Sequence, residues 1–101
     1  MAETATDERI EDRCNKLRFR AWRRGFREAD LILGPFADTH VRSLSPAQID
    51  AFETLLDQPD HDLFAWIMGV QPAPEAFEGD VLEMIRTFRF SAREARTDHG
   101  A

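Results

Sequence analysis

A chain of 101 residues is long enough for one domain and too short for two. Its formal net charge of −6 argues against general binding to nucleic acid. The single cysteine, Cys14, excludes an internal disulfide and a cysteine-based metal cluster, and no apolar run approaches the roughly 20 residues that span a bilayer.

A first helix is predicted from about Asp7 to Arg24. The segment has a narrow apolar stripe at i, i+4, i+7 and i+11, formed by Ile10, Cys14, Leu17 and Ala21. Gly25 follows at the position where a helix-ending residue with left-handed backbone belongs. Basic side chains in the last turn, Arg23 and Arg24, suit the helix dipole.

A second helix is predicted to start near Phe26, directly after the glycine. Its apolar positions keep a helical period as far as Leu44, but Gly34-Pro35 interrupts them. Proline inside a helix removes a hydrogen bond and clashes with the preceding turn. We therefore expect either a kink or two short helices here.

The third and fourth helices have clear end signals. Ser45-Pro46-Ala47-Gln48 is a capping box with proline at the first helical position, and this third helix is expected to end near Asp57. The fourth helix is predicted to be capped by Asp60 or Asp62 and to end at Gly69.

A fifth helix follows Pro72 and Pro74, with an apolar stripe formed by Phe77, Val81, Met84, Ile85 and Phe88. No alternating strand pattern and no Asn-Gly or Asp-Gly hairpin signal occurs. The sequence therefore predicts an all-α fold, a compact five-helix bundle forming a single domain over residues 1–101, with residues 1–7 and 95–101 frayed. We expect a monomer, because the bundle uses its apolar stripes internally.

Charge is unevenly distributed along the chain. Seven of the thirteen basic residues fall between residues 13 and 27, with no acid among them, whereas residues 38–83 contain ten acids and one base. Helix ends can account for part of this pattern, since Gly25 turns the chain and Glu28 suits the first turn of the second helix. Repulsion between like charges nevertheless favours a partner surface or an anionic ligand at this basic end.

Two motifs carry a resemblance to a known family. The run RRGFREADLILGPF resembles the arginine–glycine–x–x–glutamate signature of the bacterial succinate dehydrogenase flavinylation factors, whose mitochondrial relatives are assembly factors for the same enzyme. Residues 60–69, DHDLFAWIMG, resemble the family's aspartate–leucine–phenylalanine–x–tryptophan helix. The resemblance covers about residues 8–95. Ala29 and Val41 depart from common family residues and read as core substitutions.

The resemblance implies a function and a site. Members promote covalent attachment of FAD to the flavoprotein subunit of succinate dehydrogenase, and often of fumarate reductase, as chaperone-like assembly factors and not as enzymes. Catalytic residues and a tightly bound cofactor are accordingly not expected. Carried over, Arg24, Gly25 and Glu28 would contact the client, and Arg23 and Arg27 beside them would add electrostatic steering.

Other candidate residues have simpler explanations. His40, His61 and His99 match no metal-ligand spacing, so no metal site is expected. Cys14 lies on an apolar stripe, which predicts a buried and unreactive thiol. Trp66 reads as core, whereas Trp22 lies off the main stripe beside the arginines, where it could be an interface anchor.

Rival functions remain open at this stage. The short helices and the arginine-rich end would also suit a small nucleic-acid-binding or regulatory module, although the acidic body would be repelled by phosphates. An enzymatic function has the least support, because the sequence contains no recognisable set of catalytic residues. The acidic N-terminus without an apolar stretch is unlike a secretory signal or a mitochondrial transit peptide, which predicts a cytoplasmic protein without membrane insertion.

Overall fold

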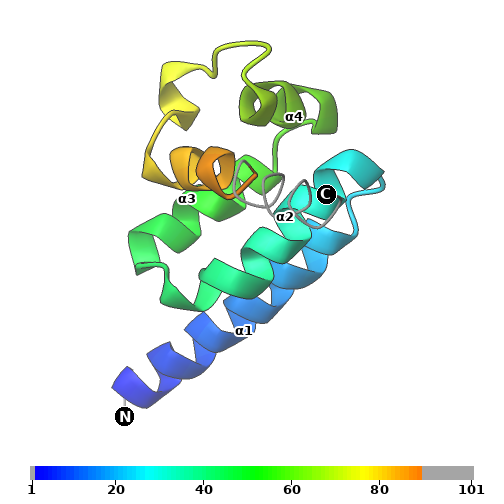
Figure 1. Ribbon diagram of the computed structural model, residues 1–101. Helices are drawn as coiled ribbons and strands as arrows, with labels where there is room; N and C mark the ends of the chain where they lie inside the picture. The colour runs from blue at the N-terminus through cyan, green and yellow to red at the C-terminus, as the bar shows by residue number, and fades with distance from the viewer. Residues whose placement is uncertain (1, 90–101) are drawn as a thin grey trace.

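The computed structural model describes the backbone of residues 2–89 and the side chains of residues 9–89, and this part of the chain is helical without strands (Figure 1). The elements are α1 (Ala2–Trp22), α2 (Arg27–His40), a 3₁₀ turn η1 (Val41–Ser43), α3 (Pro46–Leu56), α4 (Asp60–Met68), a second 3₁₀ turn η2 (Glu75–Phe77), and a C-terminal helix described over residues 80–89. The predicted five-helix, all-α fold class is confirmed.

Helices α1 and α2 form an antiparallel hairpin (Figure 1). Helices α3 and 80–89 pack across the hairpin, and α4 lies beside the turn that joins α1 to α2. None of the helices in the described part of the chain has the length and apolar character needed to cross a membrane.

Phe36 of α2 lies at the centre of the core and is fully buried. Its ring contacts Phe52 of α3 and Phe88 of the C-terminal helix edge-on, with centroid distances of 5.5 and 5.8 Å. Ala29 and Val41 are also buried, as expected for core substitutions. Three helices are therefore held together through one aromatic side chain.

The boundaries of α1 differ from those predicted. The helix begins at Ala2, because no glycine or proline interrupts residues 2–7, and it ends at Trp22, two residues earlier than expected. Arg23 and Arg24 consequently lie in the loop and not in the last helical turn. The predicted fraying of residues 95–101 concerns a segment outside the described residues.

Pro35 does not split α2, which continues from Arg27 to His40 with the proline inside it. Both sides of the proline bury apolar groups, Leu33 before it and Phe36 and Ala37 after it. Because this burial stabilises the helix on both sides, the hydrogen bond lost at Pro35 does not end it.

Helix α3 has the predicted capping box, in which Ser45 accepts a hydrogen bond from the Gln48 N–H. The predicted aspartate cap of α4 is wrong. Its N-cap residue is Pro59, and Asp60 and Asp62 lie in the first turn, where negative charge suits the helix dipole. Helix α4 ends at Gly69 with a left-handed φ of 75°, as predicted.

Phe77 was expected on the fifth helix, but it belongs to η2 and stacks on Trp66 of α4 with a centroid distance of 5.2 Å. The following helix begins only at residue 80. The prolines before η2 hold the chain extended, so the segment packs on α4 as a separate short turn. Trp66 itself is buried, as predicted.

Candidate functional site

The five predicted partner-binding residues lie in the turn between α1 and α2 and in the first two residues of α2. Gly25 has a φ of 88°, a backbone conformation that side-chain-bearing residues rarely adopt, and a Cβ added there would meet no atom within 4 Å. The Arg24 N–H donates to Asp30 Oδ1 at 3.1 Å. The left-handed glycine and the hydrogen bond from the Arg24 backbone therefore define the shape of the turn. The space around Gly25 is open to solvent.

Phe26 attaches the start of α2 to α4. Its ring lies 5.0 Å from that of Phe64 and 5.1 Å from that of His61, measured between centroids. Because both partners belong to α4, Phe26 packs the end of the α1–α2 turn against that helix. His61 is thus part of an aromatic contact, as is His40 against Phe36 and Phe88, while His99 lies outside the described residues.

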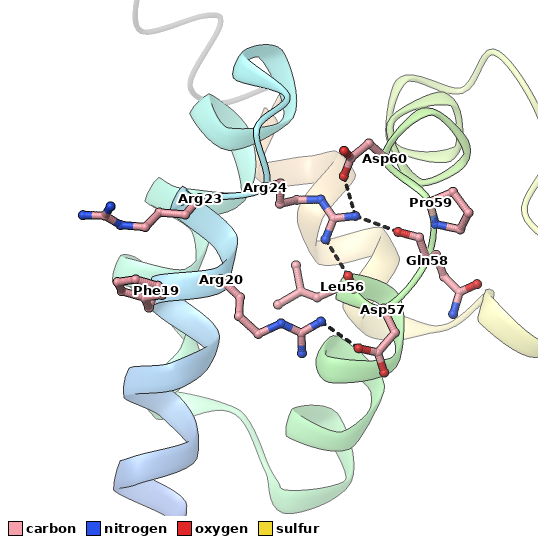
Figure 2. Close-up of a pocket in the computed structure, with 9 residues that line it drawn as sticks. All are labelled: Phe19, Arg20, Arg23, Arg24, Leu56, Asp57, Gln58, Pro59 and Asp60. Atoms are coloured by element: carbon pink, nitrogen blue, oxygen red, sulfur yellow. Dashed lines mark hydrogen bonds and ion pairs between the residues drawn. The ribbon is translucent and has the colours of Figure 1, made fainter.

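The Arg24 side chain is directed into the protein. Its Nη1 donates to the Leu56 carbonyl at 2.5 Å, and its Nη2 donates to the Gln58 carbonyl at 2.6 Å and pairs with Asp60 at 2.7 Å. The side chain is only 8% exposed. Figure 2 shows it reaching from the end of α1 to the turn between α3 and α4. We call Arg24 and these three partners the arginine clamp.

The arginine clamp pairs one cation with two backbone carbonyls and one carboxylate at two helix ends. Leu56 ends α3, where carbonyls lack helical partners and the dipole favours a cation. Asp60 opens α4, where the dipole favours an anion. A forked guanidinium reaches these acceptors from two separate nitrogens, whereas an ammonium group would have to reach them from one. The arginine of the Arg-Gly motif therefore joins three elements of the fold.

Arg23, Arg27 and Glu28 lie on the outside of the same turn. All three are exposed, and none of their side chains forms a hydrogen bond or ion pair with residues 9–89. The Arg23 guanidinium lies over the ring of Phe19, 4.7 Å from its centroid. In Figure 2 Arg23 points away from the clamp. With Gly25, these residues leave an accessible charged surface around the turn.

The expectation that repulsion among these bases favours a partner surface or an anionic ligand is wrong for most of them. Five of the seven bases in residues 13–27 pair with acids, four of them with acids of other elements. The pairs are Arg13 with Asp50 and Glu53, Lys16 with Asp12, Arg18 with Asp38, Arg20 with Asp57, and Arg24 with Asp60. The basic helix and the acidic body attract each other within the fold, which leaves Arg23 and Arg27 as the cations of this run available to a partner.

A hollow of about 450 Å³ lies between α1 and the α3–α4 turn (Figure 2). Arg20 crosses it to pair with Asp57 at 2.7 Å, and Arg24, paired with Asp60, also lines it. Two of its three arginines are thus neutralised by the two aspartates, and the third, Arg23, has no ion pair to residues 9–89. The hollow reads as a gap bridged by internal ion pairs and offers little net charge to a ligand.

Trp22 is held in a defined position, which the sequence did not predict. Its Nε1 donates to Asp38 at 3.1 Å, and its indole covers Gly34, where an added Cβ would come within 2.3 Å of the ring. Gly34 thus makes room for an aromatic side chain from the other helix. No local signal could have paired two residues from different helices, so the sequence reading treated Gly34 only as a break.

Cys14 is buried and its Sγ lies 3.7 Å from the Val41 carbonyl. Burial raises the pKa of this thiol above its ordinary value. The predicted burial of Cys14 is therefore confirmed, and the raised pKa disfavours the reactive thiolate form.

Together, the fold and the turn define a small all-α domain that exposes charge and aromatic side chains around one interhelical glycine. Residues 15–89 match the family described as "Flavinator of succinate dehydrogenase". This match covers well over half of the chain and includes the whole turn, and the chain belongs to that family.

Named relatives agree with this assignment. The chain is 39% identical over 77 residues to "Succinate dehydrogenase assembly factor 2, mitochondrial" of Dictyostelium discoideum, covering 76% of this chain and 55% of the relative. The proteins of the same name from Meyerozyma guilliermondii and Danio rerio are 35% and 28% identical, each over 80% of this chain and over 63% and 52% of their own lengths. The chain thus spans between half and two-thirds of these relatives.

Proposed function

We propose that this protein binds the flavoprotein subunit of succinate dehydrogenase and promotes covalent attachment of FAD to it. Membership of the flavinator family is the observation that carries the proposal. The relatives' names, which describe assembly factors of the same enzyme, support it. In this role the client's own residues form the flavin bond, and this protein neither catalyses the step nor holds FAD tightly.

The proposed client-binding surface is the outer side of the α1–α2 turn. Gly25, Arg23, Arg27 and Glu28 are exposed there, and a surface without side-chain bulk at Gly25 allows close approach of another backbone. Arg24 would act differently from its neighbours. Since its side chain forms the arginine clamp, it would position the turn against α4 without touching the client.

Positioning is the physical basis of the proposed effect. Holding two reacting groups in the correct geometry can lower a barrier by about 7–11 kcal/mol at best. A rigid turn that binds an assembly intermediate would hold the flavin and its attachment residue in that geometry. The turn is suited to this because Phe26, Asp30 and Arg24 fix it on three sides.

The direct test is covalent flavin on the flavoprotein subunit, read as in-gel fluorescence after denaturation, with and without this protein co-expressed. A strong rise is expected with the wild-type chain. The rise should fall several-fold with Glu28→Ala and stay unchanged with Glu75→Ala, an exposed acid in η2. No rise, with a folded client and sufficient FAD, would contradict the proposal.

Gly25→Asn distinguishes the two roles of the glycine, which are to adopt the left-handed backbone of the turn and to leave room for the client. Asparagine tolerates the left-handed backbone better than other side-chain-bearing residues, and open space surrounds the position. The variant should therefore fold but add bulk where the client approaches. If Gly25→Asn is stably folded and supports flavinylation as the wild type does, close approach at Gly25 is not required.

Binding to nucleic acid is less favoured than the sequence suggested, because most arginines of the basic run are already paired within the fold. The finer predictions remain predictions: a monomer, fumarate reductase as a further client, and a cytoplasmic location. The relatives' names include the word mitochondrial, which concerns those proteins.

A further inference from the structure

Exposed apolar side chains are concentrated on one side of the α1–α2 hairpin. Four large apolar residues are exposed among those that the structure describes, and three of them, Phe19, Trp22 and Leu31, belong to this hairpin. Phe19 is 61% exposed and Leu31 46%. The fourth, Val70, lies in the segment after α4.

These side chains share one face. Phe19, Trp22 and Arg23 lie three and four residues apart on α1 or directly after it, and the Arg23 guanidinium covers the Phe19 ring. On α2, Arg27 and Leu31 are four residues apart, and Gly34, which the Trp22 indole covers, follows Leu31 by three. We call Phe19, Trp22, Arg23, Arg27 and Leu31 the aromatic–arginine face.

Trp22 is held in place on this face by contacts within the chain. Asp38 accepts hydrogen bonds from both Trp22 Nε1, at 3.1 Å, and Arg18 Nε, at 2.9 Å. Gly34 provides the recess for the indole. An aromatic side chain held in this way loses little conformational entropy when it binds, which is a property of interface anchors.

We propose that the aromatic–arginine face is the affinity surface of this protein, and that it receives an apolar patch of the client bordered by carboxylates. The inference rests on the proposed function and adds to it: the turn around Gly25 acts at the flavin site, and the adjoining face holds the client. Two features carry it: exposed apolar area beside a fixed indole, and two arginines without an ion pair to residues 9–89 in a chain of net charge −6.

Charge distinguishes this occupant from others. A second copy of the chain would bring Arg23 and Arg27 of one molecule against those of the other, and like charges would oppose the contact. Two available cations are few for a nucleic acid or an anionic lipid surface, where affinity grows with the number of neutralised phosphates. Carboxylates around an apolar patch fit both properties of the face.

The test measures binding of the purified flavoprotein subunit, without covalent flavin, to immobilised variants of the full chain. Phe19→Ser/Leu31→Ser removes exposed apolar contacts and should weaken the affinity about tenfold or more, mainly through faster dissociation. Val70→Ser is the matched control, since Val70 is 77% exposed and lies off the face. It should bind as the wild type does.

A second pair of variants tests the charges. Arg23→Glu/Arg27→Glu should slow association several-fold at low salt and reduce its dependence on ionic strength. Arg9→Glu, at an exposed position about four turns earlier in α1, is its control and should leave the rate unchanged. Circular dichroism of every variant must match the wild type.

The outcomes separate the two proposals. If the wild type binds and Phe19→Ser/Leu31→Ser binds equally well, or if Val70→Ser loses as much, the face is not the affinity surface. A wild-type dimer that the Phe19 and Leu31 changes dissociate would assign the face to self-association and overturn the inference. Failure of the wild type itself to bind the subunit would remove the proposed function as well.

Discussion

Arg23 and Arg24 are neighbours in the sequence, yet they belong to two regions of opposite character. Arg24 enters the arginine clamp, where a buried guanidinium joins the end of α3 to the start of α4. Arg23 lies on the aromatic–arginine face, over an exposed phenylalanine and without an ion pair to residues 9–89. One arginine therefore supports the fold, and the other is available to a partner.

This difference changes how a loss of activity should be interpreted. Substituting either arginine is expected to reduce flavinylation, but Arg24 would do so by loosening the turn and Arg23 by weakening contact with the client. Activity by itself cannot tell these causes apart, whereas free energies of unfolding can.

The largest effect is expected for Arg24→Ala. It leaves two carbonyls and Asp60 without their partner, which should lower the free energy of unfolding by about 2–3 kcal/mol, allowing for the partly exposed Asp60. Arg23→Ala should change it by less than about 0.5 kcal/mol. Urea denaturation measures both, and equal values for the two variants would remove the distinction between the regions.

Gly34→Ala should be next in size. The added Cβ would overlap the Trp22 indole and force the ring out of its recess, at a cost of about 1–3 kcal/mol. Fluorescence of Trp22 should shift to the red as the ring becomes more exposed, and Trp22→Ala should remove most of the penalty in the double variant. A penalty that persists in the double variant would mean that the indole is not its cause.

A smaller effect is expected for Arg20→Ala at the edge of the hollow. Its pair with Asp57 is exposed on both sides, so breaking it should cost only about 0.2–1 kcal/mol. The loss should also shrink at high salt, since exposed ion pairs are screened. A loss as large as that of Arg24→Ala would show that the hollow, too, is essential to the fold.

The weakest expected effect is a change in the pH dependence of stability, caused by an ion pair near the C-terminal end of α4. There Arg86 donates to the Trp66 carbonyl and to Glu78, and its hydrogen bond lowers the pKa of the Glu78 carboxyl. A lowered folded-state pKa gives stability above the unfolded value of about 4.3, which is lost as the pH falls through the folded value. Between roughly pH 5 and pH 3, wild type should therefore lose slightly more stability than Glu78→Gln. Identical pH profiles in thermal unfolding would contradict this.

Much of the fold could be predicted from local pattern. The capping box at Ser45, the left-handed residues Gly25 and Gly69, and the apolar stripe with Cys14 all depend on interactions within a few residues, and all appear as expected. The errors arose where distant contacts outweighed local preference. Pro35 stays inside α2 because its neighbours are buried, and Phe77 leaves its helix to stack on Trp66.

The candidate site likewise combines features set by the local sequence with features set by distant contacts. The sequence by itself determined that an Arg-Gly turn joins two helices and that basic residues gather around it, because both follow from residue type and spacing. Only the tertiary structure decided which arginine is buried and which is exposed, since the partners of Arg24 lie more than thirty residues away, in α3, in α4 and in the turn between them. It likewise placed Trp22 in the recess at Gly34, because complementary shape between two helices has no signature in either one.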